Sequence, residues 1–276
     1  MKGEKLSVGK NLTLEAEKLA NKSRLVALRM VNKSKTSHIG SALSVIDIIS
    51  CLYVSNLYSA SKGNDHLRIV FSKGHATTAV YAVLNALDLI STEMIENYCN
   101  DGSQTYGHIN HLVHESIELS TGSLGHGLPF GVGMALASKR LNRAEKIVVV
   151  MSDGECNEGT TWESALIASH HNLTNLIVII DRNNIQSFGM TEEVLRLNPF
   201  VDKWNSFGWK TKTINGNSCD EIMSNLNQVS GPTCLIAETT KGKGVSFMEN
   251  QLAWHYKSPS DEELILASNE INSQNA

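Results

Sequence analysis

The chain has 276 residues and a net charge of −4 at pH 7, and 41% of its residues are hydrophobic. A slightly acidic chain offers no broad basic surface, so we expect it to bind neither nucleic acid nor an anionic membrane. The first ten residues lack the apolar stretch of a signal peptide, and we expect no apolar run of the roughly 18 residues that span a membrane. Five scattered cysteines without a Cys-x-x-Cys pattern are typical of reduced thiols. We therefore expect a soluble, cytoplasmic protein.

Helical and strand-like patterns alternate along the chain. The expected helices are residues 12–33, 41–56, 76–89, 92–99, 127–141, 158–171, 199–207, 219–228 and 261–267. The expected strands are residues 67–71, 147–151, 176–180, 210–214 and 232–238. Loops are expected at 59–65 and, carrying three histidines, at 100–120, and a polar frayed tail at 268–276. Without a repeat or linker, this alternation favours one α/β domain over residues 1–276, with a doubly wound, mostly parallel sheet flanked by helices.

The stretch from residue 146 to 189 contains a strand, an acidic turn, a helix and a second strand. A crossover of this kind makes the strands parallel, so Asp153 and Asn183 emerge at neighbouring carboxyl ends, where open α/β sheets bind ligands. A carboxylate and an amide oxygen suit Mg²⁺, which keeps its other positions for water and phosphate. The stretch therefore predicts a Mg²⁺-diphosphate anchor. Its simpler interpretations are an Asp-Gly turn and an asparagine cap.

Other polar segments lie outside this stretch. They are Ser37-His38-Ile39-Gly40-Ser41, Ser72-Lys73-Gly74-His75-Ala76, Gly107-His108, Thr121-Gly122-Ser123-Leu124-Gly125, and Lys241-Gly242-Lys243-Gly244 with Trp254-His255. A single histidine is more often structural than functional. His108, His111 and His114 also allow a zinc site, although nothing nearby completes the ligand set. We assign no role to His111 and His114.

Taken together, these segments resemble the transketolase family across residues 12–262, and the Asp-Gly turn with Asn183 resembles the thiamine diphosphate motif of that family. The resemblance implies a thiamine diphosphate-binding fold and Mg²⁺, with Ca²⁺ or Mn²⁺ as substitutes. The implied metal ligands are Asp153, the Asn183 side chain and the Ile185 carbonyl. The implied catalytic residues are His38, His75, His108, His255 and Glu158, the last lying between two active sites of a dimer. The implied cofactor contacts are Ser41, His75, Gly122, Ser123, Leu124, Asp153, Gly154, Glu155, Asn183 and Lys241.

The resemblance also implies what the chain does. In this family a second domain supplies the glutamate that activates the cofactor, and this chain ends before such a domain. We therefore expect the amino-terminal subunit of a split transketolase, inactive without a carboxy-terminal partner and assembled with it as a two-plus-two heterotetramer. The reaction would transfer a two-carbon ketol unit from a ketose or ketose phosphate to an aldose. Histidine suits the proton transfers on sugar hydroxyls near neutral pH.

Four positions depart from the family pattern. Ser152 stands where glycine is usual, His126 stands where glutamine is usual, and Ile39 and Ile109 stand where a proline often follows the histidine. These departures favour a modified or branched sugar over ordinary pentose phosphates. Two alternatives stay open: the α subunit of a 2-oxo acid dehydrogenase, and a non-catalytic paralogue that acts as a binding subunit.

Overall fold

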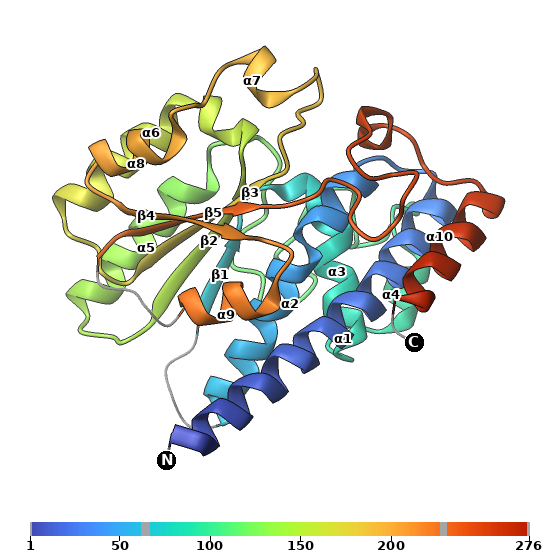
Figure 1. Cartoon of the computed structure of the whole chain (residues 1–276), viewed down its shortest axis with the longest axis horizontal. Coiled ribbons are helices and arrows are strands. Elements are labelled where there is room, and N and C mark those ends of the chain that lie inside the picture. Colours follow the sequence, from blue (N-terminus) through green and yellow to red (C-terminus); the bar gives the residue numbers. More distant parts are fainter. Residues whose placement is uncertain (1, 62–66, 227–230, 275–276) are drawn as a thin grey trace.

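Five parallel strands form one sheet in the order β1-β2-β3-β5-β4, with helices on both faces (Figure 1). The computed structural model describes residues 2–61, 67–226 and 231–274. The strands are β1 (Leu67–Phe71), β2 (Lys146–Ser152), β3 (Leu176–Arg182), β4 (Lys210–Asn215) and β5 (Thr233–Glu238). The predicted α/β class and parallel sheet are confirmed, and each predicted strand lies within two residues of an observed one.

Ten α-helices lie in the described part of the chain. They are α1 (Lys2–Ser34), α2 (Ile39–Ser61), α3 (Thr77–Ala86), α4 (Thr92–Glu96), α5 (Gly127–Arg140), α6 (Gly159–His170), α7 (Thr191–Val194), α8 (Phe200–Ser206), α9 (Cys219–Leu226) and α10 (Asp261–Ser273). Short 3-10 turns are η1 (Gly74–Ala76), η2 (Gly154–Asn157) and η3 (Leu252–His255). The first two turns directly follow the ends of β1 and β2, where the polar motifs of the sequence lie.

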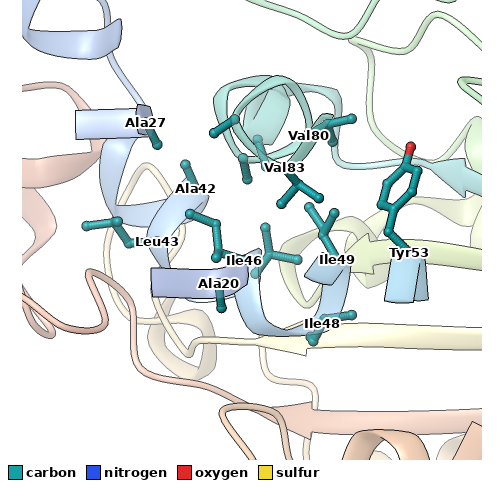
Figure 2. Packing of buried hydrophobic residues seen from close by; sticks show 14 of the residues in the cluster. Ala20, Ala27, Ala42, Leu43, Ile46, Ile48, Ile49, Tyr53, Val80 and Val83 are labelled. Atoms are coloured by element: carbon teal, nitrogen blue, oxygen red, sulfur yellow. The ribbon is translucent and has the colours of Figure 1, made fainter. Parts of the chain in front are cut away.

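Both faces of the sheet carry an apolar core, because successive strand residues point to opposite faces. Val148 and Val150 of β2 belong to the core shared with α1, α2 and α3. Val149 and Met151 belong to the core shared with α5, α6 and α8. Figure 2 shows part of the first core, with labelled side chains of Ala20, Ala27, Ala42, Leu43, Ile46, Ile48, Ile49, Tyr53, Val80 and Val83.

Helix α2 corrects one expectation from the sequence. Its segment Ile39–Asn56 has 18 residues with a mean hydropathy of 1.5, so it is long and apolar enough to cross a membrane. However, 89% of this segment is buried inside the protein, where it packs against α1 and α3 (Figure 2). The apolar composition of α2 is therefore explained by its place in the core.

The structure also corrects several expected boundaries. The expected frayed tail is wrong over residues 268–273: α10 runs to Ser273, Ile271 is fully buried, and Glu270 accepts hydrogen bonds from Ser246 N and Oγ. Helix α2 extends through Ser61 into the loop expected at 59–65, whose remainder lies outside the described residues. The expected end of α9, residues 227–228, also lies outside them. Residues 100–120 form an irregular loop, as predicted.

Helix α5 packs closely on β2 through a glycine, and this contact is testable. A Cβ atom at Gly131 would lie 2.4 Å from Val149 Cγ2, whereas one at Gly133 would meet nothing within 4 Å. We expect Gly131→Ala to destabilise the protein by about 1–3 kcal/mol through overpacking. Gly133→Ala, on the exposed side of the same helix, is the matched control and should stabilise by roughly 0.5–1 kcal/mol. Denaturant unfolding midpoints measure both, and equal midpoints would contradict the packing argument.

Candidate active site

A cavity of about 660 Å³ opens at the carboxyl ends of the strands. Its lining contains eleven of the residues implied by the sequence: His38, Ser41, His75, His108, Leu124, Asp153, Gly154, Glu158, Asn183, Ile185 and His255. They come from loops far apart in sequence that follow β1, β2, β3 and β5, because parallel strands end at the same edge of the sheet. The remaining four implied residues, Gly122, Ser123, Glu155 and Lys241, lie outside the lining.

Asp153 connects the ends of β2 and β3. Its carboxylate is buried and accepts hydrogen bonds from Gly154 N (2.8 Å), Asn184 N (3.0 Å) and Thr191 Oγ1 (2.9 Å). Burial, followed by the nearby Asp181 carboxylate, raises the pKa of Asp153. A group held in this environment gains from a bound cation, because opposite charge favours the ionised form of a carboxyl.

The turn after β3 brings two further oxygens to Asp153. Asn184 adopts a left-handed backbone conformation (φ 63°), and Asn183 Oδ1 accepts a hydrogen bond from Ile185 N (3.2 Å). Asp153, Asn183 and Ile185 all line the cavity. The carboxylate, amide and carbonyl oxygens therefore fit a hard divalent cation. At present the Ile185 carbonyl accepts a hydrogen bond from Lys241 Nζ (2.8 Å), so a cation at this carbonyl requires that amine to move.

A buried ion pair lies behind this turn. Lys73 Nζ bonds to Asp181 Oδ2, and both side chains are almost fully buried. Asp181 also accepts hydrogen bonds from Ser44 Oγ (2.6 Å), Thr239 Oγ1 and Asn183 Nδ2 (3.3 Å). Although burial raises it, Lys73 and these hydrogen bonds hold the pKa of Asp181 below its ordinary value. The sequence analysis did not single out Asp181. Its signal was a carboxylate near the end of an otherwise apolar strand, which requires a buried partner.

Four histidines surround one point of the cavity. The ring centroid of His38 lies 4.9 Å from that of His255, 5.3 Å from that of His75 and 6.2 Å from that of His108. Burial, then the charges of neighbours such as Lys241, lowers the pKa of His38 to about 4 and that of His255 to about 3. Burial also lowers the pKa of His75. These three imidazoles are neutral at pH 7, so each has one nitrogen that donates and one that accepts a proton.

The implied residues outside the lining lie in three different settings. Lys241 is fully buried, and its Nζ lies 3.0 Å from His255 Nδ1. Burial lowers the pKa of Lys241 to about 8. A Cβ at Gly122 would lie 3.6 Å from the His108 ring, so this glycine borders the histidine cluster, while Ser123 is exposed. Glu155 is fully buried away from the cavity. Contacts of these residues with a cofactor stay predictions.

The zinc alternative fails on geometry. His111 Nδ1 bonds to Ser120 Oγ (2.7 Å), and His114 Nδ1 bonds to Ser116 Oγ (2.8 Å), while His108 faces the cavity. Within residues 2–61, 67–226 and 231–274, no group of three or more His, Cys, Asp or Glu is placed to hold a metal ion. Glu158 is exposed, directly precedes α6 and lines the cavity. Its predicted place between two active sites is a property of a dimer and stays a prediction.

Comparison with known proteins agrees with this geometry. The family described as "Transketolase, thiamine diphosphate binding domain" matches residues 15–272. One of the two subunits of the apulose-4-phosphate transketolase of Phocaeicola vulgatus is 39% identical over 267 residues, covering 94% of this chain and 94% of the relative. The 6-deoxy-6-sulfo-D-fructose transketolase subunit SqwG of a Clostridium species is 33% identical over 271 residues, covering 95% and 98%.

Solved structures give the same result. The transketolase of Campylobacter jejuni superposes with a TM-score of 0.84 at 28% identity, covering 94% of this chain and 43% of that one. The transketolase of Leishmania mexicana gives 0.84 at 26% identity, covering 93% and 41%. The chain thus spans less than half the length of the solved transketolases that it matches. It belongs to the thiamine diphosphate-binding domain family of transketolases, and among its relatives it corresponds to the chains named as separate transketolase subunits. The resemblance found in the sequence is confirmed, and the 2-oxo acid dehydrogenase alternative is not supported.

The depressed histidine pKa values predict how stability depends on pH. In the unfolded chain these imidazoles bind protons near pH 6.5, whereas folded His38 does so only near pH 4. The unfolded state therefore binds more protons between pH 6.5 and 4, and stability falls as the pH is lowered through this window. His38→Asn removes one such group and keeps a residue that tolerates the left-handed backbone of this position (φ 72°). We expect the acid-side loss of unfolding free energy to shrink by on the order of 1 kcal/mol.

Denaturant titrations at pH 7 and pH 4.5 measure this change. The exposed His170→Asn in α6 is the control and should leave the difference between the two pH values as it is in the unmodified chain. An identical difference for His38→Asn and the unmodified chain would show that burial of His38 does not oppose its protonation.

Proposed function

We propose that this chain is the diphosphate-binding subunit of a two-subunit transketolase. The complete enzyme transfers a two-carbon ketol unit from a ketose or ketose phosphate to an aldose. The observation that carries the proposal is the joint presence, in one cavity, of Asp153 with Asn183 and of the histidines around His38. The first pair suits a metal-bound diphosphate, and the histidines suit a polyhydroxylated substrate.

The cofactor site is formed by residues with distinct tasks. Asp153, Asn183 and the Ile185 carbonyl would hold Mg²⁺, and Ser41, Leu124, Gly154 and Lys241 would contact the cofactor. When bound, thiamine diphosphate supplies the carbanion chemistry. Asp153 and Asn183 need no rearrangement of the backbone for this task, because the Asn184 amide already ties the turn to the Asp153 carboxylate.

The histidines handle protons on the substrate. His38, His75 and His255 are neutral at pH 7, so each can accept a proton from a sugar hydroxyl or donate a hydrogen bond to an oxygen that gains negative charge. His108 approaches the same point from the loop at 100–120. Neutral imidazoles also avoid electrostatic repulsion from Lys73 and Lys241, which lie beside them.

The names of the relatives indicate the class of substrate. Two of the related subunits are named for apulose 4-phosphate and one for 6-deoxy-6-sulfo-D-fructose, so we propose a specialised sugar. Of the four departures from the family pattern, Ser152 lines the cavity. His126 is exposed beside α5, and Ile39 and Ile109 are buried behind the site. Ser152 is therefore the departure best placed to affect the bound cofactor.

The mouth of the cavity supports a partner subunit. Phe188, Leu195 and Tyr256 line it and are 82%, 56% and 61% exposed. Large apolar side chains gathered at a functional cavity are typical of a surface that another protein covers. We propose that a carboxy-terminal transketolase subunit, holding the pyrimidine half of the cofactor, docks here and that two such pairs form a cytoplasmic two-plus-two heterotetramer.

Dependence on the partner is the first test of this function. We expect the purified chain with thiamine diphosphate, Mg²⁺ and a panel of ketose donors and aldose acceptors to give no turnover above background. Adding the matching carboxy-terminal subunit should give turnover, followed by product formation. The panel includes apulose 4-phosphate and 6-deoxy-6-sulfo-D-fructose. Full activity of this chain alone would refute the two-subunit proposal, and cofactor binding by the assembled pair without any turnover would favour the non-catalytic paralogue.

Removal of the metal ligand is the second test. We expect Asp153→Ala to weaken Mg²⁺-dependent binding of thiamine diphosphate at least 100-fold, because it removes the one carboxylate of the proposed ligand set. Calorimetry on the assembled pair, with and without Mg²⁺, measures the affinity. Asp202→Ala, in the exposed first turn of α8, is the control and should bind normally. A normally folded Asp153→Ala chain that retained the Mg²⁺ dependence would place the metal elsewhere.

A further inference from the structure

Glu155 is a buried carboxylate with no place in the chemistry described so far. It is 0% exposed and lies in η2, directly after β2. Its Oε1 accepts hydrogen bonds from Ser72 Oγ and from Gly125 N (2.9 Å), and its Oε2 accepts one from Ser152 N (3.3 Å). The resemblance implied a direct cofactor contact, but these three donors occupy the carboxylate on the side of the protein interior.

The three donors belong to three different segments. Ser72 follows β1, Ser152 ends β2, and Gly125 lies in residues 121–127, which we call the glycine loop. The backbone carbonyl of Glu155 extends the connection to α6, because it accepts a hydrogen bond from Thr161 Oγ1 (2.9 Å). One side chain with its own backbone therefore joins the ends of two strands, the glycine loop and the first turn of a helix.

The glycine loop has little freedom where Glu155 holds it. Gly125 has a φ of 83°, and a Cβ there would lie 2.5 Å from Thr160 Oγ1. Thr160 Oγ1 donates to the Gly125 carbonyl (2.8 Å), so both polar groups of this residue are bonded. At its ends the loop is held by Thr121 Oγ1, which donates to Phe71 O (2.6 Å), and by Gly127 N, which donates to Ser72 Oγ (3.0 Å).

The position of the loop determines what faces the cavity. Leu124, next to Gly125, lines the cavity, and so do Ser152 and Asp153 on the β2 side. Glu155 bonds to the amide neighbours of both groups, at Gly125 and at Ser152. An apolar side chain in its place would leave two backbone amides and a hydroxyl buried without acceptors, at a cost of about 1–3 kcal/mol for each.

We propose that Glu155 is a positioning residue that fixes the glycine loop against the ends of β1 and β2, so that Leu124 and Asp153 face the cavity in a set relation before any ligand binds. The proposal rests on the proposed cofactor site for its purpose and on the unliganded chain for its geometry. It replaces direct cofactor contact by Glu155 with an effect transmitted through Gly125 and Ser152.

Amide hydrogen exchange of the unliganded full chain tests the geometry. Glu155→Gln keeps the size of the side chain but replaces one acceptor oxygen by an NH₂ donor, which cannot accept from Gly125, Ser152 or Ser72. We expect the Gly125 and Ser152 amides to exchange at least tenfold faster, with amides of β3 unchanged. Glu118→Gln, which alters a carboxylate paired with Arg68 elsewhere, should leave the exchange of Gly125 as it is in the unmodified chain.

Calorimetry with Mg²⁺ and inorganic pyrophosphate then tests the purpose. We expect Glu155→Gln to weaken pyrophosphate binding at least tenfold and Glu118→Gln to leave it unchanged. Unchanged exchange at Gly125 overturns the proposal, and so does faster exchange with unchanged pyrophosphate affinity, because either result removes the link between the carboxylate and the site. Failure of the unmodified chain to bind pyrophosphate counts against the proposed function, whereas the exchange result still decides whether Glu155 holds the loop.

A second variant decides the matter if Glu155→Gln does not fold. Ser72→Ala removes one donor to Glu155 and the acceptor of Gly127 N. We expect faster exchange at Gly127, a smaller increase at Gly125, and pyrophosphate binding weakened in proportion. Unchanged exchange at both amides in a folded Ser72→Ala chain overturns the proposal.

Discussion

The register of β2 against β3 is the constraint on which the site depends. Ser152 pairs with Asp181, and Asp153 N donates to Asp181 O (3.2 Å) just beyond the last pair. This register brings the Asp153 carboxylate against the Asn184 amide and directs Asp181 toward Lys73. A slip of one residue would turn the side chain of Asp181 to the other face of the sheet. It would also place the charged residues of the strand ends in the apolar cores.

The charges at this edge are balanced in pairs. Asp181 has Lys73 as a buried partner, whereas Asp153 is bonded to neutral donors. The second lysine, Lys241, donates to the Ile185 carbonyl and lies against His255. Two buried ammonium groups next to the histidine rings disfavour a further positive charge, which is one reason why the pKa values of His38 and His255 are depressed. The protonation state that suits proton transfer at pH 7 therefore follows from the groups around the diphosphate site.

The sequence predicted the strands and the approach of Asp153 to Asn183, because apolar runs and parallel crossovers have strong local signatures. It predicted the meeting of four histidines only through a family resemblance, since their spacing carries no distance information. The environment of Glu155 was not predictable, because its donors come from segments about 83 and 30 positions away. The helix at 268–273 was missed because a polar composition concealed the single buried Ile271, and the apolar length of α2 depends on packing partners that sequence pattern does not identify.

A site assembled in this way needs little reorganisation to bind its ligand. The glycine loop, the turn after β3 and the histidines are already held by bonds within the protein, so ordering them costs no free energy at the moment of binding. The exception is Lys241, whose amine must leave the Ile185 carbonyl before that oxygen can face a cation. An amine released in this way gains an anionic diphosphate as a new partner. Metal and diphosphate should therefore bind with positive coupling, since each makes the other's contact with this lysine and carbonyl more favourable.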